Sequence, residues 1–300
     1  MNTIEKALAK QKLSAQDNKD NLKAESLNAQ NQDALKTSTA ELETQHSSIV
    51  GNSKKETLTL NGDRLTARGF IYGTGSAHHI QEEFRHIKRK LLNNAFGPAA
   101  KTLKHSNLIM VTSSNANEGK TFISINLALS IALEQEKTVL LVDADVLRPS
   151  IHRELEFESK QGLLEYLLDD VTSLSDVIYN TNVTNLKIIP AGKPHHLTNE
   201  LLASTKMATL AQELAQRYPD RIVIFDCPPI LGVTETPVLS SLVGQAVVVV
   251  EESKTKLEDV KKAVSQLHED IAIGFVMNKT VRSKKDEYGY YGYGYGKKHS

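Results

Sequence analysis

The chain has 300 residues, of which 40% are hydrophobic and 24% charged, enough for a sizeable core and too apolar for a chain disordered throughout. Its 36 Lys and Arg residues balance 36 Asp and Glu residues, so it lacks the global basic field of a nucleic-acid-binding protein. One cysteine excludes an intramolecular disulfide and fits a reducing compartment. No stretch reaches the roughly 20 apolar residues of a membrane helix. We expect a cytoplasmic protein without direct membrane insertion.

The N-terminal region differs in composition from the rest of the chain. Residues 1–69 contain no aromatic residue, and about 11–55 are rich in Gln, Asn, Ser, Lys and Glu. Such a stretch buries too little apolar surface to offset the entropy lost on ordering. We therefore predict that residues 1–76 are largely disordered, with a short amphipathic helix possible over 2–10. A folded domain over 77–283 and a flexible tail over 284–300 complete the predicted organisation.

From residue 77 onward the sequence alternates between helical and strand-like patterns. Phe84, Ile87 and Leu91 recur at helical spacing. Short apolar runs then alternate with helical segments, which indicates βαβ units and a buried parallel sheet. We predict strands over 108–112, 138–143, 186–190, 221–226, 246–250 and 271–276, and helices over 121–134, 199–216 and 257–268. This pattern favours a doubly wound, three-layer α/β sandwich with a mostly parallel sheet.

A phosphate-binding loop is predicted between the strand at 108–112 and the helix that follows it. Gly119 lets the backbone approach a phosphate without a Cβ atom. Lys120 can neutralise the β- and γ-phosphates, and the Thr121 hydroxyl can bind Mg²⁺. Ser114 stands where the P-loop pattern has its first glycine. The candidate nucleotide-binding residues are Ser114, Asn115, Asn117, Glu118, Gly119, Lys120, Thr121 and Phe122.

Two further strands end in carboxylates. Asp143 and Asp145 close one apolar run, and Asp226 closes another, followed by Cys227, which we interpret as a buried thiol. Ligands of open parallel sheets bind at the carboxyl ends of the strands. Mg²⁺ commonly takes one or two carboxylates together with phosphate and water. The three motifs therefore predict one site for a nucleotide and Mg²⁺.

The chain resembles the bacterial tyrosine kinases, P-loop kinases unrelated in fold to the eukaryotic protein kinases. The resemblance rests on four segments with the order of the family's motifs and covers about residues 77–296. These segments are the Walker A loop at 113–121, the A-prime motif at 139–148, the Walker B motif at 222–229 and a C-terminal tyrosine cluster. Within the family the chain most resembles the autokinases of exosortase-linked exopolysaccharide loci.

The resemblance implies a deviant-Walker fold shared with the partition ATPases and an ATP-dependent protein-tyrosine autokinase. Lys120 would contact the β- and γ-phosphates of ATP, with Thr121, Asp145 and Asp226 holding Mg²⁺. Asp143 is the candidate that orients or deprotonates the incoming tyrosine, and Asp145 is the alternative. The expected acceptors, reached in trans, are the tail tyrosines Tyr288, Tyr290, Tyr291, Tyr293 and Tyr295.

The resemblance also implies assembly and partners. Glu82, Arg85 and Lys88 match the family's E-x-x-R-x-x-R helix, which contacts the next protomer in a ring, with Lys88 in place of the second Arg. A membrane chain-length-determinant protein, or polysaccharide co-polymerase, is the implied activator, so the kinase would be peripheral to the inner membrane. A tyrosine phosphatase is a further implied partner, nucleic acid is not one, and exopolysaccharide biosynthesis or export is the implied process.

Other classes of protein share parts of this pattern. A partition or septum-positioning ATPase without kinase activity is the main alternative. Such ATPases usually carry a second lysine near the start of the P-loop, whereas residues 113–117 contain none. A degenerate kinase acting as a scaffold is disfavoured because Lys120, Thr121 and the three aspartates are all present. A GTPase is disfavoured because Asn278 and Lys279 are followed by Val281 where an N-K-x-D motif has Asp.

Overall fold

The computed structural model describes residues 56–73, 78–218 and 220–281. The possible helix at 2–10 and the tyrosine tail at 284–300 lie outside the described residues. Eight strands form one sheet in the order β1-β4-β5-β3-β6-β2-β7-β8. Their bounds are β1 Thr57–Leu58, β2 Leu108–Ser113, β3 Thr138–Asp143, β4 Tyr179–Thr181, β5 Leu186–Ile189, β6 Arg221–Asp226, β7 Gln245–Glu251 and β8 Ala272–Asn278.

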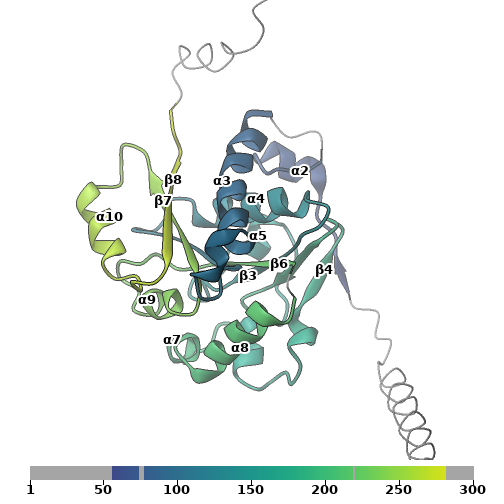
Figure 1. Ribbon diagram of the computed structural model, residues 1–300. Helices are drawn as coiled ribbons and strands as arrows, with labels where there is room; N and C mark the ends of the chain where they lie inside the picture. Colours follow the sequence, from purple (N-terminus) through teal and green to yellow (C-terminus); the bar gives the residue numbers. More distant parts are fainter. Residues whose placement is uncertain (1–55, 74–77, 219, 282–300) are drawn as a thin grey trace, which may run out of the picture. The chain divides into compact units, whose positions relative to one another are not determined.

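All neighbouring strands are parallel except β4 and β5, which pair antiparallel. Figure 1 shows helices on both sides of the sheet, with α3, α4 and α5 on one side and α7, α8 and α9 on the other. The helix bounds are α2 Gly62–Ala67, α3 His78–Phe96, α4 Lys120–Ala132, α5 Ile151–Glu154, α6 Leu163–Leu167, α7 Thr198–Leu202, α8 Thr205–Gln216, α9 Glu235–Ser240 and α10 Leu257–Val264, with 3₁₀ turns η1 Pro98–Lys101 and η2 Leu174–Val177. The predicted three-layer, mostly parallel α/β fold is confirmed.

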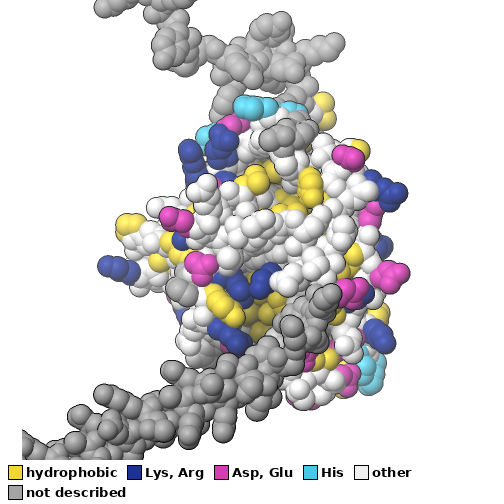
Figure 2. Space-filling view, turned by 90° about the vertical axis from the view of Figure 1, so that its right-hand side faces the viewer, with side chains coloured by type: hydrophobic (Ala, Val, Ile, Leu, Met, Phe, Trp, Pro, Cys, Tyr) yellow, Lys and Arg dark blue, Asp and Glu magenta, His cyan; other side chains and the backbone are white. Residues whose placement is uncertain are grey.

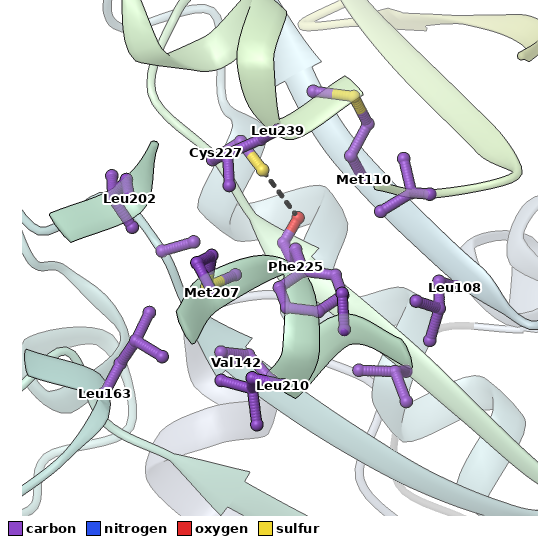
Figure 3. Packing of buried hydrophobic residues seen from close by; sticks show 14 of the residues in the cluster. Leu108, Met110, Val142, Leu163, Leu202, Met207, Leu210, Phe225, Cys227 and Leu239 are labelled. Atoms are coloured by element: carbon purple, nitrogen blue, oxygen red, sulfur yellow. Dashed lines mark hydrogen bonds between the residues drawn. The ribbon is translucent and has the colours of Figure 1, made fainter. Parts of the chain in front are cut away.

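The side-chain alternation of the central strands builds a core on each face of the sheet. In β2, Leu108 and Met110 pack toward the α8 side, whereas Ile109 and Val111 pack toward α3 and α4. Figure 3 shows the α8 side, where Met207 lies over the strands. There the Cys227 thiol donates to the carbonyl oxygen of Phe225 at 3.5 Å. Burial raises the pKa of this thiol well above its usual value, in agreement with its interpretation as a core residue.

The segment predicted as one helix over 199–216 forms two helices, α7 and α8. They separate at Ser204, whose backbone is extended at φ −76° and ψ 157°. The Ser204 hydroxyl accepts a hydrogen bond from the amide of Met207 at 3.2 Å, which caps α8. A new helix begins here because the cap satisfies one of its free amides. Residues Met207, Leu210, Ala211 and Leu214 then form its buried face.

The predicted domain start at residue 77 is wrong, because residues 57–72 belong to the fold. Strand β1 pairs with β4 through Thr57 and Asn180. The backbone of Ile71 donates to Asn126 Oδ1 in α4 at 2.8 Å. Five apolar side chains of this segment enter the core beside α3 and α4, namely Leu58, Leu60, Leu65, Phe70 and Ile71. Their spacing is irregular because they belong to a two-residue strand, one short helix and two loops, so no single period marks them.

The described residues contain no helix with the length and hydropathy needed to cross a membrane. On the face shown in Figure 2, basic and acidic side chains are interspersed, and neither sign dominates a large area. This face therefore offers no extended basic surface for a nucleic-acid backbone.

Lys88 of α3 is buried against α4, with its side chain only 9% exposed. Its ammonium donates to the carbonyl oxygen of Ser130 at 2.9 Å and lies 2.6 Å from Glu134 Oε1. We expect Lys88→Met to lower the free energy of unfolding by about 1–3 kcal/mol, because it removes charge-assisted hydrogen bonds at the end of α4. Urea denaturation measures this loss, and the exposed Lys90→Met is the control, which should change stability by less than about 0.5 kcal/mol. Equal midpoints for the two variants would contradict the assignment.

Candidate functional site

The loop between β2 and α4 has the backbone of an anion-binding loop. Gly119 caps α4 at φ 97°, in the left-handed region that favours glycine. Asn117 is also left-handed, at φ 67°. A Cβ atom on Gly119 would lie 2.0 Å from Asn278 Nδ2, so both the conformation and the space require glycine. The first amides of α4 have no partner within the helix and carry its positive dipole end.

An open cavity of about 620 Å³ lies in front of this loop. Its wall combines the loop, the segment after β3 and the segment after β6, as expected for the carboxyl edge of a parallel sheet. The lining residues are Ala116, Asn117, Gly119, Lys120, Thr121, Phe122, Asp145, Leu147, Arg148, Ser150, Arg153, Glu154, Pro228, Pro229, Gly232 and Val233. This volume is within the range of small-molecule sites.

Lys120 and Asp145 face each other at the cavity wall. Lys120 Nζ lies 4.0 Å from Asp145 Oδ2, and both side chains are about nine-tenths buried. The backbone amide of Arg148 donates to Asp145 Oδ1 at 3.2 Å, which fixes the carboxylate. Burial raises the pKa of Asp145, and the positive charge of Lys120 opposes that shift. The arrangement places one ammonium and one carboxylate at the site where phosphate would bind.

Thr121 connects the phosphate-binding loop to the end of β6. Its Oγ1 donates to Asp226 Oδ2 at 2.7 Å and lies 2.6 Å from the Ser150 hydroxyl. Ser124, one helical turn further along α4, donates to Asp226 Oδ1 at 2.9 Å. Burial raises the pKa of Asp226 to about 6, although both hydroxyl donors favour its charged form.

These oxygen donors fit Mg²⁺. Within the described residues no three His, Cys, Asp or Glu side chains gather into a metal site of their own. Mg²⁺, however, typically binds through one or two carboxylates together with phosphate and water. Thr121 and Asp226 supply the hydroxyl and one carboxylate, and Asp145 on the cavity wall supplies a second. Burial raises the pKa of both carboxyl groups, and a bound cation would favour their charged forms.

Asp143 lies behind the cavity wall rather than on it. Its side chain is 1% exposed, and its Oδ2 accepts hydrogen bonds from the amides of Ser150 and Ile151 at 3.2 and 3.1 Å. Its Oδ1 is buried and finds no hydrogen-bond partner among the described residues. Burial, followed by the negative charge of Asp226, raises the pKa of Asp143 well above its usual value. Asp143 therefore holds the start of α5 in place through these two hydrogen bonds.

The predicted nucleotide-binding residues divide into two groups. Asn117, Gly119, Lys120, Thr121 and Phe122 line the cavity. Ser114 is fully buried, with no partner found for its hydroxyl in the described part of the chain. Glu118 accepts hydrogen bonds from the amide of Asn115 at 3.0 Å and from the Thr255 hydroxyl at 2.5 Å. The Glu118 side chain therefore braces the loop from behind by accepting from the Asn115 backbone and from Thr255.

Several residues that line the cavity were not among the predicted site residues, although Arg148 lies within the A-prime motif. Ser150, Arg148 and Arg153 reach the cavity because α5 begins directly after the A-prime motif. No helix was predicted at 151–154, although Ser150, which precedes α5, is of a residue type favoured at helix starts. The sequence pattern could not show which residues after β6 line the cavity, because this segment is irregular and its side chains do not alternate with a regular spacing.

The predicted oligomer contacts lie on α3. Glu82 and Arg85 pair with each other on its surface, where their side chains are 34% and 46% exposed. Lys88, in contrast, is engaged with α4 of its own chain. The described part of α3 therefore presents Glu82 and Arg85, but not the Lys88 ammonium, to a neighbouring molecule.

A parallel sheet with a phosphate-binding loop after β2 and aspartates after β3 and β6 defines a P-loop nucleotide-binding protein. A family model described as an AAA domain matches residues 106–274. Tyrosine-protein kinase YwqD of Bacillus subtilis is 34% identical over 213 residues, which cover 70% of this chain and 86% of that protein.

Two further proteins extend the comparison. The putative tyrosine-protein kinase CapB of Staphylococcus aureus is 33% identical over 214 residues, covering 71% of this chain and 90% of that protein. The kinase domain of the Escherichia coli tyrosine kinase ETK superposes with a TM-score of 0.60 at 26% identity, covering 73% of this chain and 81% of that chain. The chain belongs to the bacterial tyrosine-protein kinases.

Proposed function

We propose that the protein uses MgATP to phosphorylate the tyrosine cluster of its own tail, in trans. One observation carries the nucleotide part of this proposal, namely that Lys120 and Asp145 lie 4.0 Å apart on a cavity wall that also includes Thr121. Family membership supports the choice of tyrosine as acceptor. Five of the nine tyrosines of the chain fall within residues 288–295.

The residues of the cavity have separate roles in the proposed reaction. Phosphoryl transfer depends mainly on positioning and on stabilisation of charge. The amides of the loop and the Lys120 ammonium bind the β- and γ-phosphate oxygens, while Thr121 and Asp226 would hold the metal, which leaves the Asp145 carboxylate for the acceptor tyrosine. Bound Mg²⁺ would supply positive charge that offsets the charge developing on the transferred phosphoryl group.

Asp145 is better placed than Asp143 to receive the proton of the acceptor tyrosine. A general base must come within hydrogen-bond reach of that proton. Asp145 lines the cavity, whereas Asp143 is 1% exposed and already accepts two backbone hydrogen bonds. We therefore assign Asp143 to the positioning of α5 and Asp145 to contact with the tyrosine hydroxyl.

The proposed reaction contains its own electrostatic switch. Each phosphotyrosine adds about −1.5 to −2 charges. Several such groups within residues 288–295 would repel one another and the carboxylates of the site, which favours release of the tail and dissociation of a ring joined through α3. The partners we propose are a membrane polysaccharide co-polymerase as activator and a tyrosine phosphatase that resets the tail. The proposed process is exopolysaccharide biosynthesis or export at the inner membrane.

The proposal is tested by mixing two variants with MgATP and mapping phosphotyrosine by mass spectrometry. One variant is the chain ending at residue 287, which retains Lys120 but lacks the five tyrosines. The other is full-length Lys120→Met, which retains the tyrosines. We expect phosphate on the tail of Lys120→Met in the mixture and none when either variant is incubated alone.

Tail phosphorylation in wild type but not in the mixture would contradict transfer in trans. No phosphotyrosine in wild type, even with the cytoplasmic segment of a co-polymerase added, together with measurable ATP hydrolysis, would contradict the kinase. That result would favour the ATPase switch.

A further inference from the structure

The end of β8 supports the phosphate-binding loop from behind. Asn278 Nδ2 donates to the carbonyl oxygen of Glu118 at 2.8 Å, and Lys279 Nζ donates to the carbonyl oxygen of Asn117 at 2.7 Å. The loop packs directly on Asn278, since a Cβ atom at Gly119 would lie 2.0 Å from its amide nitrogen. Neither Asn278 nor Lys279 belongs to the cavity wall. These side chains can therefore act on a bound phosphate only through the loop.

The two contacts fix the direction of two peptide groups. In a trans peptide, the C=O and the following N–H point in opposite directions. Donors that hold the carbonyls of Asn117 and Glu118 on the β8 side therefore turn the amides of Glu118 and Gly119 away from β8, in a loop whose residues Asn117 and Gly119 line the cavity. In the part of the chain that the structure describes, neither amide has an acceptor within the protein. Inward-facing amides without an acceptor are the groups that bind phosphate oxygens.

These contacts also support the backbone conformation of the loop. Asn117 and Gly119 are both left-handed, a region that asparagine enters less readily than glycine. Lys279 is itself held by Glu251, whose Oε2 lies 3.1 Å from its ammonium. Lys254 contacts the same oxygen at 3.3 Å. No contact between Lys254 and the loop is found among the described residues, so the two lysines form a matched pair.

We propose that Asn278 and Lys279 are positioning residues that set the phosphate-binding amides of the loop. The inference rests on the proposed nucleotide site and deepens it. The role proposed for Asn278 and Lys279 does not involve recognition of a guanine base, because both side chains donate hydrogen bonds to the backbone of the loop. The consequence is that nucleotide affinity depends on residues outside the cavity.

The test is a fluorescence titration of the full-length protein with the N-methylanthraniloyl derivative of ADP in the presence of Mg²⁺. We expect Lys279→Met to raise the dissociation constant about five- to tenfold, because the Asn117 carbonyl loses a charged donor. Lys254→Met should stay within about twofold of wild type, because it removes only the partner of Glu251. Thermal unfolding without nucleotide should be the same for both variants.

Asn278→Asp is the second variant, because it replaces a donor by a charged acceptor facing the Glu118 carbonyl. We expect it to weaken binding at least tenfold. Wild-type nucleotide affinity in Lys279→Met, or an equal loss of affinity in Lys254→Met, would overturn the positioning role and leave the proposed nucleotide site standing. A wild-type protein that fails to bind the nucleotide would overturn the proposed nucleotide site and this inference with it.

Discussion

Lys120→Met should lower the rate of tail phosphorylation by about 10²–10³-fold, the effect of removing one preorganised group that stabilises charge in a transition state. The Lys120 ammonium is about nine-tenths buried at the cavity wall, 4.0 Å from Asp145. It can approach a phosphate there with little competition from water, so its electrostatic contribution is large. Methionine keeps the length of the aliphatic chain and removes the charge. Quantitative phosphotyrosine mass spectrometry after incubation with MgATP measures the change.

The control for this prediction is Lys101→Met, which removes an exposed lysine at the end of η1 and should leave the rate unchanged. Thermal unfolding separates a chemical defect from loss of the fold. Asp145 is the carboxylate that the described residues place 4.0 Å from Lys120, and its pKa is already raised by burial, so Lys120→Met leaves a carboxyl group that can protonate. Transfer at more than a tenth of the wild-type rate would mean that Lys120 is not the principal phosphate-binding cation.

The residues that converge at the site were predictable because the three strands that carry them, β2, β3 and β6, are parallel. Asp143 and Asp226 each end an apolar strand, Thr121 follows the loop after a third, and parallel strands deliver such positions to one edge. β3 and β6 pair in register, with Asp143 opposite Asp226. The sequence motif and the strand rule together therefore place these groups within reach of one another. The motif and the strand rule do not determine which carboxylate faces the cavity. Asp143 and Asp145 both stand at the end of β3, and the turn of the chain after the strand decides which of them reaches the cavity.

The supports of the loop were not predictable in the same way. Asn278 and Lys279 follow the last strand, and their motif suggests a role only when compared with guanine-binding proteins. Their contacts with the carbonyls of Glu118 and Asn117 span more than 150 residues of sequence. Such contacts depend on the order of β2, β7 and β8 in the sheet. Alternation of strands and helices predicts that a sheet exists, but several strand orders satisfy the same pattern.

The N-terminal boundary shows a different limit. Composition and periodicity identify an ordered segment next to a polar stretch only when that segment is long or has a regular pattern of apolar residues. Residues 57–72 are neither, yet Leu65 and Phe70 are each 2% exposed. Asn182 Oδ1 accepts a hydrogen bond from the Leu60 amide at 2.8 Å, and Asn182 Nδ2 donates one to the Leu60 carbonyl oxygen at 3.0 Å. The Asn182 side chain thus makes the pair of hydrogen bonds that a neighbouring strand would make through its backbone. A pattern search for strands does not detect such an interaction.

Removal of residues 1–76 should therefore destabilise the domain severely, whereas removal of residues 1–55 should not. Each of the five buried apolar side chains between 57 and 72 contributes about 1.5–3 kcal/mol through burial. Together these contributions are comparable with the whole stability of a typical domain, about 5–15 kcal/mol. Urea denaturation of the chain beginning at residue 56 should reproduce the midpoint of the full chain. The chain beginning at residue 77 should unfold at a much lower urea concentration or fail to fold.

If the chain that begins at residue 77 yields no folded protein, Leu65→Ala in the full chain tests the packing of residues 57–72 instead. Leu65 is 2% exposed in the core beside α4, so we expect a loss of about 2–5 kcal/mol. The exposed Arg64 on the same helix provides the control, because Arg64→Ala removes only a surface pair with Glu156. Equal midpoints for Leu65→Ala and Arg64→Ala would mean that α2 packs too loosely to belong to the core. Since α4 carries Lys120 and Thr121 at its first turn, the contacts of Phe70 with Phe122 and of the Ile71 amide with Asn126 make the N-terminal segment part of the scaffold that positions the phosphate site.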